Sequence, residues 1–240
     1  MRWLEQFESA TAVPFASVSQ NSNRFFNSTP IFLFFPLIFL YLEMLTPWFY
    51  PAALGKFNGS NINAIIFITV ISMLCFFSLP VLYAKILLRE SPADFGLRRP
   101  ANLFKALLWT LAALLLLEPY IVYFTHLPVF KNYYAVQSVA WWKLIAVNLF
   151  IFPIQYFAEE FFFRGFLFIG IWRRLKWHSF WITDIIFTYS HFNKPFQEVL
   201  LCIPASIILN ILTLNTKSIY PAVIVHSCLG MTLCVLVNMH

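Results

Sequence analysis

The run AEEFFFRG contains three charged residues whose types and spacing could do chemistry, Glu159, Glu160 and Arg164. Residues four apart share one face of a helix, so Glu160 and Arg164 are predicted to form a structural ion pair. Glu159 is rotated by about 100° from Glu160 on the same helix. Its carboxylate is therefore predicted to stay available as a general base or acid. The alternative is that all three residues form a structural polar clamp between helices.

Two histidines in later apolar runs are further candidates, His191 in FTYSHFN and His226 in YPAVIVHSCLG. At a rise of about 1.5 Å per residue, Glu159 lies about 21 Å, His191 about 20 Å and His226 about 13 Å from the expected cytoplasmic ends of their helices. One carboxylate and two imidazoles from three helices are thus predicted to converge on one buried polar site. For either histidine alone, an ordinary hydrogen bond between helices is the alternative.

A buried carboxylate with two imidazoles suits hydrolysis of an amide or ester inside a membrane. The carboxylate would take a proton from water, one histidine would position that water, and the other would donate to the developing oxyanion. This mechanism needs no cofactor. The alternative is a zinc ion with an open fourth position, held by Glu159, His191 and His226. The chain contains neither HExxH nor GxSxG, the motifs of zinc proteases and serine hydrolases.

The composition shows what must position these residues. Of the 240 residues, 60% are hydrophobic and 11% are charged, whereas soluble domains carry about 25% charged residues. This excludes a soluble cytosolic enzyme, a disordered tail and a secreted disulfide scaffold, and it predicts an all-α, polytopic helical bundle in a lipid bilayer. No basic run is long enough to indicate a nucleic-acid partner.

The apolar runs predict about seven transmembrane helices, or eight. A polar lead at 1–29 precedes a transmembrane domain at 30–240. The predicted spans are 31–50, 63–88, 104–125, 142–172, 178–192, 197–215 and 218–238. Lysine and arginine concentrate on one side of these spans, which predicts a cytoplasmic N-terminus and an external C-terminus.

The order EExxxRG, then FxxxH, then a histidine on a third helix resembles the CAAX protease and bacteriocin-processing family of glutamic-type intramembrane endopeptidases. The resemblance covers about residues 85–235 and includes the loop SPADFGLRRP. It implies a protease-like core in that range, a membrane-anchored or C-terminally tagged protein or peptide as substrate, and location in a bacterial plasma membrane.

The resemblance also implies a role for each matching residue. Glu159 resembles the base that activates water, and Glu160 with Arg164 resembles the family's structural pair. His191 resembles the histidine that binds the water or the substrate carbonyl, and His226 resembles the one that stabilises the oxyanion.

Position 230 departs from the resembled pattern, because Gly230 stands where the family's third motif, HxxxN or HxxxD, has a polar residue. Glycine has no side chain to donate a hydrogen bond. The candidate substitutes are Asn210, Ser227 and Asn193. Phe187 and Asp184 precede His191 by about one and two helical turns on the same face, and supporting roles are expected for both.

Two other functions stay open on the sequence alone. In a proton-coupled carrier, Glu159, His191 and His226 would relay protons across the membrane. In a non-catalytic membrane scaffold, Gly230 would mark a site that has lost activity. The ordered motifs, and the lack of an internal repeat typical of many carriers, favour the endopeptidase.

Overall fold

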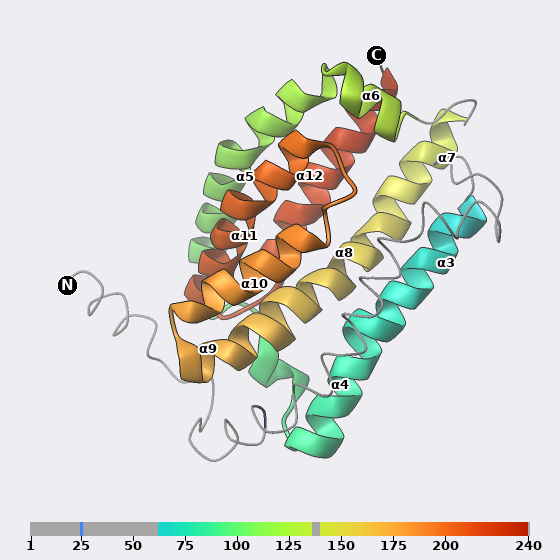
Figure 1. Cartoon of the computed structure of the whole chain (residues 1–240). Coiled ribbons are helices and arrows are strands. Elements are labelled where there is room, and N and C mark those ends of the chain that lie inside the picture. The colour runs from blue at the N-terminus through green and yellow to red at the C-terminus, as the bar shows by residue number, and fades with distance from the viewer. Residues whose placement is uncertain (1–24, 26–61, 136–139, 240) are drawn as a thin grey trace.

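A computed structural model describes residue 25 and residues 62–135 and 140–239 of the chain (Figure 1). The regular elements of this described part are all helices. Five of them are long and apolar enough to cross a membrane: Ile65–Leu88, Leu103–Thr125, Trp141–Leu175, Phe196–Thr216 and Tyr220–Met239. The prediction of an all-α, multi-pass membrane protein is thereby confirmed. The predicted span at 31–50 and the polar lead, apart from Phe25, lie outside the described residues.

Several helices change from α-helical to wider, π-helical turns along their length. The first long helix consists of α3 (Ile62–Ser72), η1 (Met73–Ser78), α4 (Leu79–Tyr83) and η2 (Ala84–Leu88). After η3 (Pro92–Phe95) come α5 (Leu103–Thr125) and the short α6 (Pro128–Tyr134). The third long helix consists of α7 (Trp141–Ala146), η4 (Val147–Ile151), α8 (Phe152–Glu160), η5 (Phe161–Ile169) and α9 (Gly170–Leu175). It is followed by α10 (His178–Tyr189), α11 (Phe196–Thr216) and α12 (Tyr220–Met239).

The predicted span at 178–192 is wrong in its length. Helix α10 has 12 residues, about 18 Å, which is too short for a hydrocarbon core of about 30 Å. His191 lies in the turn after the helix. Two local features are found beyond this end. The Ser190 hydroxyl donates to the Phe187 carbonyl at 2.7 Å, and Pro195 has no N–H and disfavours helix in the residue before it.

The third long helix lies between α3–α4 on one side and the group of α5, α11 and α12 on the other (Figure 1). Its η5 segment is the centre of the core, since all nine residues from Phe161 to Ile169 are buried. By contrast, α5 is apolar on an exposed face, and Leu115 is 78% exposed. Such a face is expected where a helix contacts lipid.

The loop SPADFGLRRP packs on the helix that carries the charged motif. Gly165 has no Cβ, and one built there would lie 2.6 Å from the Phe95 carbonyl oxygen, so glycine permits the close approach. The loop also binds the connection between α11 and α12, where Arg98 Nε donates to the Lys217 carbonyl at 3.0 Å. Burial, together with the charges of Arg98 and Lys105, lowers the pKa of Lys217.

Candidate active site

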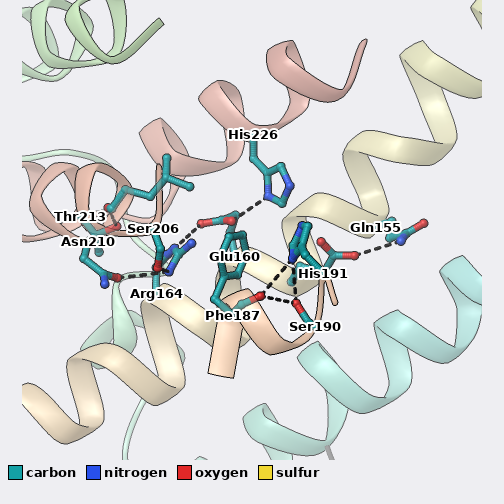
Figure 2. Close-up of polar contacts among 12 residues, drawn as sticks. Gln155, Glu160, Arg164, Phe187, Ser190, His191, Ser206, Asn210, Thr213 and His226 are labelled. Carbon is teal, nitrogen blue, oxygen red and sulfur yellow. Dashed lines mark hydrogen bonds and ion pairs between the residues drawn. The ribbon is translucent and has the colours of Figure 1, made fainter. Parts of the chain in front are cut away.

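A buried ion pair joins α8 to the η5 segment. Arg164 Nε lies 3.1 Å from Glu160 Oε2, and both side chains are fully buried. The other oxygen of Glu160 lies 2.8 Å from Nδ1 of His226 on α12. Figure 2 shows Glu160 between Arg164 and His226. The charged motif and the last helix, 66 residues apart in sequence, thus meet at one carboxylate.

Arg164 connects this carboxylate to α11. Its Nη1 donates to Ser206 Oγ at 2.9 Å and to Asn210 Oδ1 at 3.4 Å. Both partners in turn donate to Asp184 Oδ1, Ser206 at 2.5 Å and Asn210 at 3.1 Å. Asp184 therefore holds the two side chains that accept hydrogen bonds from Arg164. Asn210 lies on the Arg164 side of Glu160 rather than on the His226 side (Figure 2), which argues against it as a substitute donor beside His226.

Glu159 faces a different environment from Glu160. Gln155, one turn earlier on α8, donates from Nε2 to Glu159 Oε1 at 2.9 Å. Glu159 is partly exposed whereas Glu160 is fully buried. Its second oxygen has no hydrogen-bond partner among the described residues. One oxygen is therefore held in place, and the other is available to accept a proton.

His191 is held by the end of α10. Its Nδ1 lies 3.0 Å from the Phe187 carbonyl oxygen and 3.0 Å from Ser190 Oγ. A ring that donates from Nδ1 to a carbonyl presents a lone pair on Nε2, which suits a histidine that accepts a hydrogen bond from water.

Phe187 links the two histidines to the ion pair. Its ring centroid lies 4.7 Å from that of His191 and 6.0 Å from that of His226. The guanidinium carbon of Arg164 lies 4.3 Å from the Phe187 ring centroid. Residues of η5, of α12 and of the turn after α10 are thus gathered around one phenyl ring of α10.

The sequence reading missed Tyr156 and Gln155, both on α8. The Tyr156 ring stacks on the His226 imidazole, with centroids 4.4 Å apart and an interplanar angle of 28°. The signal for both was helical spacing, because they precede the glutamate pair by about one turn. Of the proposed substitute donors, Ser227 has a buried hydroxyl oxygen that finds no hydrogen-bond partner among the described residues, and Asn193 lies in the turn after His191.

The residues named as possible zinc ligands are not grouped as a metal site in the described part of the chain. Across residues 62–135 and 140–239, no three His, Cys, Asp or Glu residues lie close enough together to hold a metal ion. The set Glu159, His191 and His226 therefore does not form a ligand cluster in this conformation.

Comparison with known proteins identifies the region that carries the site. Residues 139–232 match the family model described as type II CAAX prenyl endopeptidase, Rce1-like. The resemblance to the CAAX proteases is confirmed. The CAAX-protease-like region runs from the start of α7 into α12, so it includes Glu159, His191 and His226. No curated protein and no solved structure matches the chain.

Proposed function

We propose that this protein is an intramembrane endopeptidase that hydrolyses a peptide bond of a membrane-associated protein or peptide, using water activated by Glu159. The observation that supports this most is a coincidence of two independent findings. The region that matches the CAAX prenyl endopeptidases is also the region in which Glu160 binds both Arg164 and His226, and in which the Phe187 ring lies beside His191 and His226. Glu159, next to Glu160 on α8, is the partly exposed carboxylate of this region.

The proposed chemistry divides the work between these side chains. Glu159 takes a proton from water as a general base, and Gln155 fixes its orientation through the 2.9 Å hydrogen bond. His191 accepts a hydrogen bond from the same water through Nε2. His226, positioned by Glu160, stabilises the tetrahedral oxyanion. The mechanism uses no metal ion, and zinc bound by Glu159, His191 and His226 is the alternative.

We also propose that the N-terminus is cytoplasmic and that the long helices cross a bacterial plasma membrane. Basic residues at one end of the bundle support the orientation. Arg98 donates to the Lys217 carbonyl, and Arg173 pairs with Glu90 at 2.5 Å. The positive-inside rule assigns such an end to the cytoplasm. In variants with a cysteine in place of Lys176 or Lys131, cysteine labelling on intact cells should locate position 176 inside and position 131 outside. The reverse pattern would contradict the orientation.

The activity is tested with purified protein in liposomes and a farnesylated peptide ending in Cys-aliphatic-aliphatic-X, with a fluorophore and a quencher on either side of the expected cleavage site. The same peptide without the farnesyl group is the second probe. We expect cleavage by the wild type and a loss of at least about 100-fold in Glu159→Gln, the contribution typical of a general base.

The matched control is Glu118→Gln, which changes another intramembrane carboxyl. Glu118 lies on α5 and accepts a hydrogen bond from Thr232 at 3.2 Å. We expect this variant to cleave at the wild-type rate. A wild-type protein that cleaves neither peptide, or a Glu159→Gln variant as active as the wild type, would contradict the proposed function.

A further inference from the structure

The hydroxyl of Tyr156 occupies the space in which a side chain at position 230 would begin. A Cβ atom built on Gly230 would overlap the Tyr156 hydroxyl oxygen and lie 2.6 Å from Cζ of the phenol ring. Gly230 follows His226 by four residues on α12, about one helical turn. A polar atom therefore does lie beside position 230, but it comes from α8.

The phenol also lies next to the proposed catalytic residues. It stacks on His226 at 4.4 Å between centroids. On its own helix it precedes Glu159 by three residues and Glu160 by four, so it is a neighbour of both carboxylates on the helix surface. Among the residues that the structure describes, none forms a hydrogen bond with the Tyr156 hydroxyl. Its proton is therefore available to a ligand.

A neutral tyrosine hydroxyl can donate a hydrogen bond to an oxyanion, whereas Nε2 of His226 can do so only when the imidazole is charged. Nδ1 of His226 lies 2.8 Å from Glu160 Oε1. A neutral imidazole that donates from Nδ1 has a lone pair on Nε2 and cannot donate to an oxyanion from that atom. A neutral phenol has a donor. An oxyanion beside His226 would thus find a neutral donor in Tyr156.

We propose that Tyr156 is a catalytic residue whose hydroxyl donates a hydrogen bond to the oxyanion of the tetrahedral intermediate. This inference rests on the proposed endopeptidase function. Water attacks the scissile carbonyl carbon, a C–O bond forms, and the proton of the water passes to Glu159. The carbonyl π electrons move onto the oxygen, which accepts the hydrogen bond from Tyr156. The carbonyl then re-forms, the C–N bond breaks, and the leaving amine takes the proton from Glu159.

The first test is Tyr156→Phe, which removes only the hydroxyl oxygen and keeps the ring that stacks on His226. We expect kcat on the farnesylated peptide to fall roughly 100-fold, as for other single oxyanion donors. KM should stay near the wild-type value, because the hydrogen bond forms in the transition state. The control is Tyr220→Phe at the start of α12, with kcat and KM expected at wild-type values.

The second test moves the donor to the other helix. Tyr156→Ala should lose kcat as Tyr156→Phe does. The double variant Tyr156→Ala/Gly230→Asn should have a kcat about tenfold or more above that of Tyr156→Ala, because the amide can donate from α12. Gly230→Asn alone should lose activity, since its Cβ would overlap the phenol. Melting temperatures of all variants show whether each one is folded.

The outcomes separate this inference from the proposed function. If Tyr156→Phe has wild-type kcat while Glu159→Gln is inactive, the assignment of Tyr156 is overturned and the endopeptidase function stands. If Tyr156→Phe loses kcat only in proportion to a loss of folded protein, and the asparagine at position 230 restores nothing, Tyr156 has a packing role and the inference is also overturned. A wild-type protein without cleavage activity overturns both.

Discussion

Removal of the Arg164 guanidinium is predicted to destabilise the protein strongly. Both members of the Glu160–Arg164 pair have no exposed side-chain surface. In Arg164→Met, an apolar chain of similar length fills the space, so the main effect is electrostatic. Glu160 would keep its buried charge and would lose the partner at 3.1 Å. Breaking a buried ion pair on one side costs about 3–5 kcal/mol, and we expect a loss of that size in the free energy of unfolding.

The double variant Arg164→Met/Glu160→Gln isolates the cause. Glutamine removes the unpaired charge and keeps an amide that can hydrogen-bond His226. We therefore expect the double variant to be more stable than Arg164→Met alone by about 1–3 kcal/mol, although it carries one more substitution. Arg164→Lys is the matched control for charge, because it keeps the cation but loses the fork that reaches both Glu160 and Ser206.

The measurement is reversible unfolding in mixed micelles, with SDS as denaturant and tryptophan fluorescence and circular dichroism as readouts. An Arg164→Met protein whose free energy of unfolding lies within about 1 kcal/mol of the wild-type value would refute the reasoning, since a buried unpaired charge destabilises a protein by more than that. A double variant less stable than Arg164→Met would refute it as well. Either result would show that Glu160 is neutral or hydrated in the folded protein.

Three further predictions concern the surroundings of the ion pair. Gly230→Ala should destabilise the wild type by about 1–3 kcal/mol through overlap with Tyr156, but should stabilise the Tyr156→Ala protein by roughly 0.5–1 kcal/mol in chemical unfolding; equal effects in both backgrounds would contradict the packing. Asp184→Ala should lower the free energy of unfolding by about 1–3 kcal/mol, because Ser206 and Asn210 lose an acceptor; full stability and full peptidase activity would exclude a supporting role. A strong chelator should leave cleavage of the farnesylated peptide unchanged, and a loss restored by zinc would overturn the metal-free mechanism.

The parts of the site that sequence alone predicts are those within one helix. The ion pair of Glu160 with Arg164 follows from helical periodicity, as does the different direction of Glu159, because residues on one helix have nearly fixed angular relations. The apolar runs likewise predict most of the helices, since lipid requires long segments without charge. The predicted spans at 104–125 and 197–215 differ by no more than one residue at either end from the observed helices Leu103–Thr125 and Phe196–Thr216.

The end of α10 was not predictable from apolarity. Residues 178–192 are apolar enough to suggest a span, but hydropathy does not show where the backbone stops being helical. Local hydrogen bonding contributes to this end, since the Ser190 hydroxyl donates to the Phe187 carbonyl. As a result, His191 leaves the helix and its ring is oriented by the same carbonyl at 3.0 Å.

The role of Tyr156 was hidden because it depends on the register between two helices. Glu160 on α8 meets His226 on α12, and Tyr156, four residues earlier, meets Gly230, four residues later. The two helices are therefore antiparallel, and a step of one turn back along α8 corresponds to a step of one turn forward along α12. A search for a substitute at position 230 among its sequence neighbours finds Ser227 but cannot find Tyr156. A single contact between the helices is enough to find it, because that contact fixes the register and brings the phenol of α8 beside the glycine of α12.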